Sequence, residues 1–195
     1  ASNVLNYVWK NLHEREKLVL RALAESLGSE SEEDFAEILR TEINYKNFKK
    51  AIKSLRKLNL IIQKRGTVYI ELHPLVKEFI RYNYISEERN VYISLLINYY
   101  DKMVVILKPR LNDKLTYDEL KSFTNKIELS INAKKYNDAI GHLLEIMTAM
   151  TNAGYIEEYL RVSKLLFDSI TWKRKTILEY PQFDILFIFI TGVSF

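Results

Sequence analysis

The sequence predicts a mainly α-helical protein with one β-hairpin in its first half. Three observations predict this. The 195 residues include only five glycines and three prolines, fewer than turn-rich all-β folds require. Apolar residues recur at intervals of three and four along most of the chain, which is the helical period. Between residues 60 and 72, two β-rich runs flank a turn at Arg65-Gly66-Thr67.

Three helices are predicted before the basic part of the chain. The first covers residues 3–12 and the second residues 14–27, where Gly28 is suited to the C-terminal cap. A third helix begins at Ser31, and Asp34 three residues later gives a pattern close to a capping box. These helices are expected to pack their leucine, isoleucine and phenylalanine faces together.

A fourth helix is predicted over residues 45–58, with Asn44 as its N-cap. Residues 44–66 contain eight basic residues and no acidic residue, so this stretch creates a local positive field. One face of the helix is apolar and consists of Phe48, Ile52 and Leu55. The opposite face is basic and consists of Lys46, Lys50, Lys53 and Lys57, with Lys49 and Arg56 at its margin.

The hairpin at residues 60–72 is followed by Pro74, which suits the first turn of another helix. The resulting order is three helices, a basic helix, a hairpin and a helix. This order is typical of a winged-helix domain, in which the basic helix is the recognition helix and the hairpin is the wing. We therefore predict a winged-helix domain over residues 1–85.

Residues 86–195 are predicted to form a second domain, an antiparallel array of α-helical hairpins, because the predicted connections are short. Tyr136-Asn-Asp-Ala139 with Leu143 resembles the second helix of a tetratricopeptide repeat, and the array is expected to continue beyond residue 195. A final helix or strand is predicted over 183–191. The other predicted helices cover residues 86–107, 116–132, 136–153 and 155–170.

Several kinds of chemistry are not expected here. The chain has no cysteine, its three histidines are isolated, and it lacks the glycine spacing of a P-loop. We therefore predict a protein that is not an enzyme, with no catalytic residue, no metal site and no cofactor of its own. The apolar run at residues 185–190 is shorter than the roughly 20 residues of a membrane span, so no membrane partner is expected. The lack of cysteine fits a cytoplasmic location.

Two surfaces are candidates for binding. The five lysines of the basic helix could enter the major groove of duplex DNA while Lys64 and Arg65 of the wing contact phosphates. The alternative is a solvated basic face, or one that docks on an acidic neighbour. The apolar tail, residues 183–195, is a candidate for packing on another chain or for oligomerisation.

Three stretches resemble a known family. Residues 14–23 (EREKLVLRAL), 51–61 (AIKSLRKLNLI) and 69–81 (YIELHPLVKEFIR) are similar to the winged-helix segment of the STAND class of signalling NTPases. This class includes apoptotic ATPases, plant resistance proteins and bacterial multidomain regulators. The resemblance covers residues 12–85 in sequence and residues 86–195 in architecture.

The resemblance implies that an ATPase core precedes the winged helix and that a helical-repeat sensor follows it. His73 stands where the family has the histidine that senses the bound nucleoside diphosphate, although Pro74 replaces the acid that usually follows. ATP or ADP would be relevant only with an upstream ATPase core. The first hypothesis is thus a regulatory and sensor fragment whose partners are that core and a protein trigger. The alternative is a freestanding DNA-binding regulator with a helical dimerisation domain.

Overall fold

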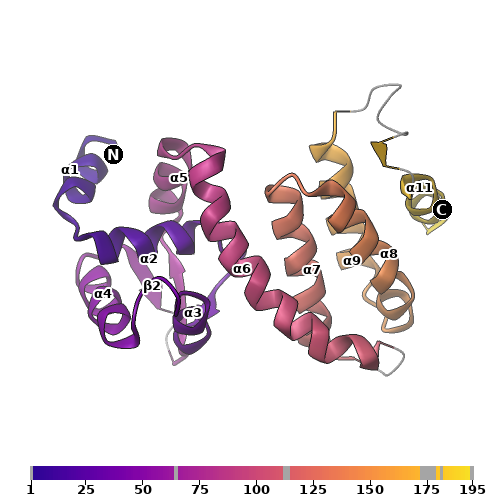
Figure 1. The fold of residues 1–195 in the computed structure, drawn as a ribbon, viewed down its shortest axis with the longest axis horizontal. Helices are drawn as coiled ribbons and strands as arrows, with labels where there is room; N and C mark the ends of the chain where they lie inside the picture. Colours follow the sequence, from indigo (N-terminus) through magenta and orange to yellow (C-terminus); the bar gives the residue numbers. More distant parts are fainter. Residues whose placement is uncertain (1, 64–65, 112–114, 172–178, 181, 194–195) are drawn as a thin grey trace. The chain divides into compact units, whose positions relative to one another are not determined.

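The protein is mainly helical and contains one small antiparallel sheet. The computed structural model describes residues 2–63, 66–111, 115–171, 179–180 and 182–193 (Figure 1). The chain divides into two compact units, residues 1–99 and residues 100–195. Each unit has its own buried core, and each is described separately below.

The first unit follows the predicted order of elements, with one additional strand. Helices α2 and α4 pack against each other, and α5 packs on α2. The elements are α1 (Ser2–Asn11), α2 (Glu14–Glu25), β1 (Glu30–Ser31), α3 (Glu32–Ile38), α4 (Tyr45–Lys57), β2 (Ile61–Gln63), β3 (Tyr69–Leu72), α5 (Pro74–Asn83) and the first part of α6 (Ser86–Leu107).

The sheet has three antiparallel strands in the order β1-β3-β2. The predicted hairpin is confirmed, because Ile61 pairs with Leu72 and Gln63 pairs with Ile70. Strand β1 was not predicted. It contains two residues, too few to show the alternation of apolar and polar residues that identifies a strand.

The start of α3 and the start of α4 are capped as the sequence predicts. The Ser31 hydroxyl accepts a hydrogen bond from the Asp34 amide at 3.0 Å, and the Asn44 side chain accepts one from the Asn47 amide at 2.9 Å. The predicted end of the second helix was wrong. Helix α2 stops at Glu25, because Ser26 adopts an extended conformation, so Gly28 does not cap it.

The core of the first unit is formed by large apolar side chains from the helices and the central strand. The rings of Phe35 and Phe48 lie 6.4 Å apart, and Ile70 of β3 is fully buried. Each such side chain contributes roughly 1.5–3 kcal/mol when it leaves water. This packing fixes the apolar face of α4 inward, which leaves the other face of that helix toward solvent.

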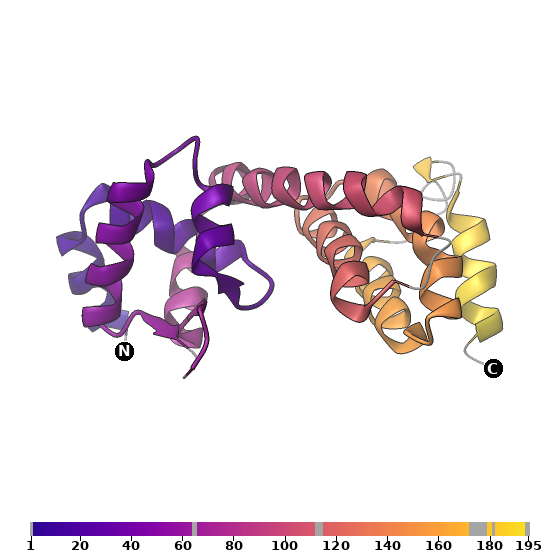
Figure 2. The same ribbon diagram turned by 90° about the horizontal axis from the view of Figure 1, so that it is seen from below.

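Where the structure describes it, the second unit contains the rest of α6 and five further elements. Helices α7, α8 and α9 lie side by side (Figure 2). Residues 133–135 and 153–155 join them, which are the short connections that the sequence predicts. The elements are η1 (Lys108–Arg110), α7 (Tyr117–Asn132), α8 (Tyr136–Asn152), α9 (Ile156–Ser169) and α11 (Phe183–Val193).

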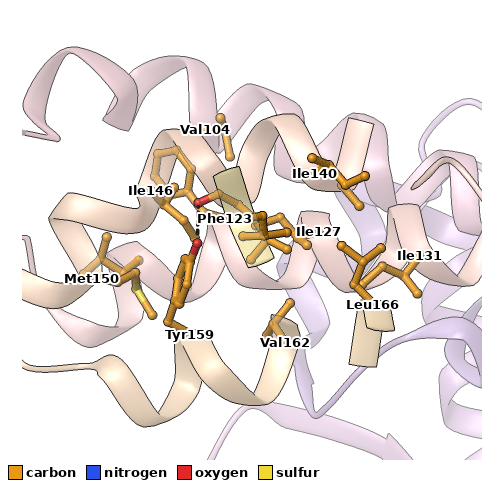
Figure 3. Packing of buried hydrophobic residues seen from close by; sticks show 14 of the residues in the cluster. Val104, Phe123, Ile127, Ile131, Ile140, Ile146, Met150, Tyr159, Val162 and Leu166 are labelled. Atoms are coloured by element: carbon orange, nitrogen blue, oxygen red, sulfur yellow. Dashed lines mark hydrogen bonds between the residues drawn. The ribbon is translucent and has the colours of Figure 1, made fainter. Parts of the chain in front are cut away.

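The core of the second unit lies among these helices and includes Phe123, Ile146 and Leu166 (Figure 3). Tyr159 is fully buried there, and its hydroxyl donates a hydrogen bond to the Leu143 carbonyl at 3.2 Å. A buried hydroxyl needs such a partner, and this hydrogen bond offsets the cost of removing the Tyr159 hydroxyl from water.

The apolar tail is helical where it is described. Helix α11 buries Phe183 and Leu186, and the Phe183 ring lies 4.8 Å from that of Phe167. Ile185 and Phe187 are 58% and 50% exposed. The open choice between helix and strand is thus settled for Phe183–Val193, and residues 194–195 lie outside the described part of the chain.

The two compact units meet inside a helix. We predicted a boundary between residues 85 and 86, whereas the compact units divide between Tyr99 and Tyr100. The start of α6 belongs to the first unit because Arg89 pairs with Glu25 of α2, with Nε 2.8 Å from Oε1.

Candidate functional site

The basic face predicted for residues 45–58 lies on α4. The buried side of this helix consists of Phe48, Ala51, Ile52 and Leu55. All five predicted lysines are exposed, so the helix brings them together on its outer side: Lys46, Lys49, Lys50, Lys53 and Lys57. Lys64 and Arg65 lie outside the described residues.

One carboxylate divides this basic surface. Glu32, at the start of α3, pairs with both Lys49 and Arg56, and its Oε2 lies 2.5 Å from Arg56 Nη2. The Glu32 side chain is only 11% exposed. Within the described part of the chain, the other four lysines of α4 have no ion pair. We define these four, Lys46, Lys50, Lys53 and Lys57, as the free lysine row.

The pKa values reflect this pairing. Burial works to raise the pKa of Glu32, but the hydrogen bonds from Lys49 and Arg56 outweigh it and leave the pKa below its ordinary value. The hydrogen bond to Glu32 raises the pKa of Lys49. Both groups therefore remain charged near neutral pH, and the single negative charge of Glu32 is shared by two of the positive charges on this side of α4.

Sequence analysis did not identify Glu32 as part of this surface. Glu32 lies 17 residues before Lys49 and 24 before Arg56, so no helical spacing links them. The only signal was the contrast between the acidic stretch around Ser31 and the basic stretch after Asn44, which predicts attraction but not a specific pair.

His73 begins helix α5 at its junction with β3. Its Nδ1 accepts a hydrogen bond from the Leu75 amide at 3.3 Å, and Pro74 occupies the first helical position. The His73 amide also donates to the Leu60 carbonyl of the hairpin at 3.3 Å. This half-buried histidine thus caps α5, and with Nδ1 used as an acceptor, a neutral ring carries its proton on Nε2.

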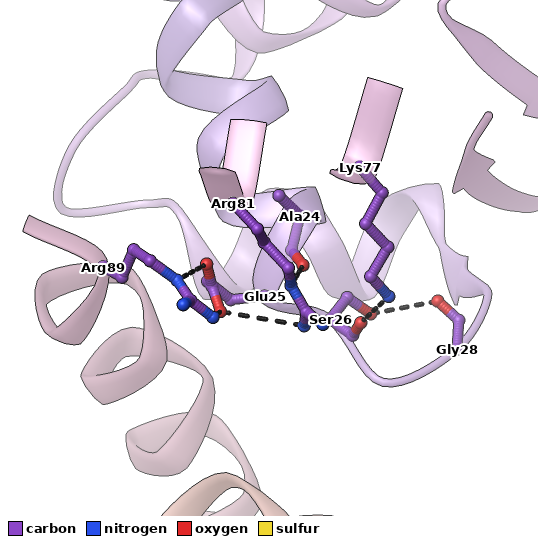
Figure 4. Close-up of polar contacts among 7 residues, drawn as sticks. All are labelled: Ala24, Glu25, Ser26, Gly28, Lys77, Arg81 and Arg89. Atoms are coloured by element: carbon purple, nitrogen blue, oxygen red, sulfur yellow. Dashed lines mark hydrogen bonds and ion pairs between the residues drawn. The ribbon is translucent and has the colours of Figure 1, made fainter. Parts of the chain in front are cut away.

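A cluster of cations surrounds the C-terminal end of α2 (Figure 4). The Glu25 carboxylate accepts two hydrogen bonds from Arg89, at 2.8 and 3.0 Å. Arg81 Nε donates to the Ala24 carbonyl and Lys77 Nζ to the Ser26 carbonyl, at 2.8 and 2.7 Å. Cations at a helix C-terminus satisfy its unpaired carbonyls and its dipole, so this cluster holds α5 and α6 to α2.

The described residues show neither a metal-binding cluster nor a helix that could span a membrane. Within the described ranges, no group of three or more histidine, aspartate or glutamate side chains is arranged to hold a metal ion. No helix in that part of the chain is both long and apolar enough to cross a lipid bilayer. No known protein family, curated protein or solved structure matches the chain.

Proposed function

We propose that the chain is a non-catalytic regulatory module, a winged-helix domain followed by a tetratricopeptide-like array, as in the control portion of a STAND-class ATPase. The order of elements in the first unit carries this proposal. Helix α4 follows α3 along the chain, which is the order of a helix-turn-helix pair, and β1 joins the hairpin β2–β3 in one sheet. In this assignment, α4 is the recognition helix and the array binds a protein trigger.

The position of His73 supports the proposal. It lies at the corner between β3 and α5, where the family resemblance places the nucleotide-sensing histidine. Because Nδ1 caps the helix, a contact with a nucleotide bound to an upstream core would come from Nε2. Such a contact would differ between nucleotide states, as a switch requires.

The test begins with the natural polypeptide that carries this segment. Tryptic mass spectrometry should find a protein much larger than 23 kDa with a P-loop peptide upstream. In that protein, His73→Asn keeps a side chain that caps helices well but removes the imidazole. We expect this variant to retain at least tenfold less ADP after purification, with an unchanged unfolding temperature. His142→Asn is the matched control.

A natural product of about 23 kDa without a P-loop peptide would refute the regulatory proposal, because there would be no ATPase to control. Retention of ADP by His73→Asn equal to that of the unaltered protein would remove His73 from the mechanism and leave it with its capping role alone.

A second candidate function, duplex DNA binding, is favoured by the free lysine row. Four exposed lysines without ion pairs lie on the helix that a winged-helix domain inserts into the major groove. A lysine side chain ends in one flexible ammonium group, whereas arginine has a planar guanidinium that can form two parallel hydrogen bonds to a base. These lysines are therefore suited to contacts with DNA phosphates. Binding would therefore depend on charge more than on base sequence.

Salt dependence tests this second function. Four phosphate contacts give a slope of about −3.6 in a plot of log affinity against log salt. The triple variant Lys46→Glu, Lys50→Glu and Lys53→Glu should abolish binding. The control variant Lys10→Glu, Lys134→Glu and Lys135→Glu changes the net charge equally on exposed sites elsewhere and should lower affinity far less. Absence of binding at about 50 mM salt, or equal loss in both triples, would reject DNA binding.

A further inference from the structure

A cleft of about 390 Å³ opens in the first unit between α2, the start of α4 and α6. It does not include the basic face of α4 or His73. Polar and charged side chains form much of its wall, and Leu18 and Ile43 provide an apolar part. The remaining lining residues are Glu14, Arg15, Arg21, Glu42, Asn44, Asn47 and Tyr92.

Arg15 is the unusual residue of this cleft. It is half-buried, and its Nε is covered from solvent without a hydrogen-bond partner. Among the residues that the structure describes, the Arg15 guanidinium has neither an ion pair nor a hydrogen bond. A partly desolvated charge without a partner costs folding free energy, so such a group needs an explanation beyond the fold.

The other charged groups of the cleft have partners. Arg21 Nη2 lies 2.6 Å from the Tyr84 hydroxyl, and its guanidinium stacks 4.1 Å from the centre of that ring. Glu14 is paired with Lys17 at 2.8 Å, and Glu42 accepts a hydrogen bond from the Thr41 hydroxyl at 3.1 Å. Arg21 Nε is covered without a hydrogen-bond partner, as Arg15 Nε is, but only the Arg15 guanidinium lacks any hydrogen bond among the described residues.

A neutral donor lies near the same cleft. The Asn47 side chain is half-buried, and its carboxamide has no hydrogen-bond partner in the part of the chain described. The backbone N–H of Asn47 is a separate group, which donates to the Asn44 side chain that caps α4. A planar guanidinium fork and an amide donor are suited to an oxyanion, and the guanidinium fork binds carboxylates in a bidentate manner.

We propose that this cleft binds a small organic monocarboxylate, whose carboxylate pairs with Arg15 and hydrogen-bonds to Asn47 while its apolar body lies against Leu18 and Ile43. Glu14 and Glu42 balance the charges of Arg15 and Arg21, so the four charged side chains of the cleft have no net positive charge with which to hold a polyanion. Polyphosphates and nucleic acid are thus disfavoured by charge. The proposal does not depend on the regulatory or DNA-binding function.

Benzoate is the probe, and benzamide, which has the same ring without the charge, is the matched ligand control. Binding to the full 195-residue chain is followed by NMR, with the Arg15 Nε–H and Asn47 amide signals as local reporters. We expect benzoate to shift both signals, and Arg15→Gln to weaken its binding at least tenfold. Lys10→Gln removes one exposed positive charge elsewhere and should leave the affinity unchanged.

A stability measurement separates ligand binding from a structural role of Arg15. Because the guanidinium has no partner among the residues that the structure describes, Arg15→Met should raise the midpoint of thermal unfolding by about 2–5 °C without ligand and abolish the stabilisation by benzoate. A lower midpoint in Arg15→Met would overturn the proposal, since Arg15 would then serve the fold.

Two binding outcomes would also overturn it. Unchanged benzoate affinity in Arg15→Gln, or equal binding of benzoate and benzamide, would remove the carboxylate contact. Phenyl phosphate tests the charge selection. It should bind more weakly than benzoate, and tighter binding would show that the cleft is not built for a monocarboxylate.

Discussion

The carboxylate of Glu25 shows how one residue holds several elements together. Its side chain is 2% exposed and lies between Arg89 and Arg81, which reach it from α6 and α5. Removing one partner from a buried ion pair leaves the other charges uncompensated, which costs more than the pair itself contributes.

We therefore expect Glu25→Gln to lower the free energy of unfolding by about 3 kcal/mol, as measured by urea titration. The control is Glu14→Gln, whose carboxylate is 84% exposed and paired only with Lys17, and which should change stability by less than about 0.5 kcal/mol. Equal effects of the two substitutions would mean that burial gives Glu25 no special role.

Glu32 makes a prediction about pH. Its folded-state pKa is below its ordinary value of 4.5, so the folded chain binds this proton less readily than the unfolded chain. The stabilisation is complete above the unfolded pKa and is lost as the pH falls through the folded pKa. The difference in unfolding free energy between the unaltered chain and Glu32→Gln should thus be constant near pH 7, begin to decrease near pH 4.5 and vanish only below the lower folded-state pKa.

The same variant tests the division of the basic surface. Glu32→Gln releases Lys49 and Arg56 from their shared carboxylate, so any affinity for duplex DNA should rise and its salt slope should steepen by up to about 2. The pH measurement has its own contradicting outcome. If the difference in unfolding free energy between the unaltered chain and Glu32→Gln persisted unchanged to pH 3, Glu32 would not act through its charge.

At the residue scale, the sequence could predict contacts between near neighbours. The Ser31 cap with Asp34 and the Asn44 cap were identified because a cap depends on residues within one turn. The pairs of Glu32 and Glu25 could not be predicted, because their partners are far away in sequence and are brought close only by packing. That Arg15 lacks an ion pair in the described part of the chain could not be predicted either, because it depends on which side chains the packing brings near the guanidinium.

At the scale of elements, three helices end in the same way. After α4, α7 and α8, the chain adopts a left-handed conformation at Asn59, Lys134 and Gly154, with φ of 55°, 60° and 79°. In each case the next residue's amide donates to a carbonyl of the last turn, as Lys135 does to Ser130 at 2.8 Å. Glycine or asparagine occupies two of these positions, as the conformation favours, but lysine occupies the third.

Lys134 is therefore a strained position. Lys134→Gly should stabilise the chain by about 1 kcal/mol, because glycine adopts this conformation without a Cβ penalty. Gly154→Lys is the reciprocal change and should destabilise it by a similar amount. Thermal unfolding of both variants measures the effect, and a loss of stability in Lys134→Gly would contradict the strain.

Element types were predictable and some element limits were not. The periodic apolar pattern identified α6 over the same residues, 86–107, that the structure gives. Helix α2 ends two residues before its predicted end, because the Ser26 hydroxyl hydrogen-bonds to the Gly28 carbonyl and the Glu30 carboxylate in the turn that follows. The spacing of apolar residues does not indicate such a turn. Strand β1 exists only through pairing with β3, so its own two residues could not identify it.

At the scale of the whole molecule, each compact unit has a separate core. The buried residues of the first unit come from α2 to α6, and those of the second from α6 to α11. We therefore expect a fragment of residues 1–107 to fold without the remainder. Its amide NMR spectrum should reproduce the signals of α2, α4 and the sheet in the intact chain. A spectrum with collapsed dispersion would show that the cores depend on each other.

The helix that belongs to both units has a practical consequence. Proteases cut where a backbone can detach and extend, usually at a loop tip, and residues 99–100 lie inside a hydrogen-bonded helix that contains neither glycine nor proline. Limited digestion should therefore leave the two units joined at the position where they divide. A cut at that position would require α6 to unwind, so the rate of cleavage there would report directly on how often this helix opens.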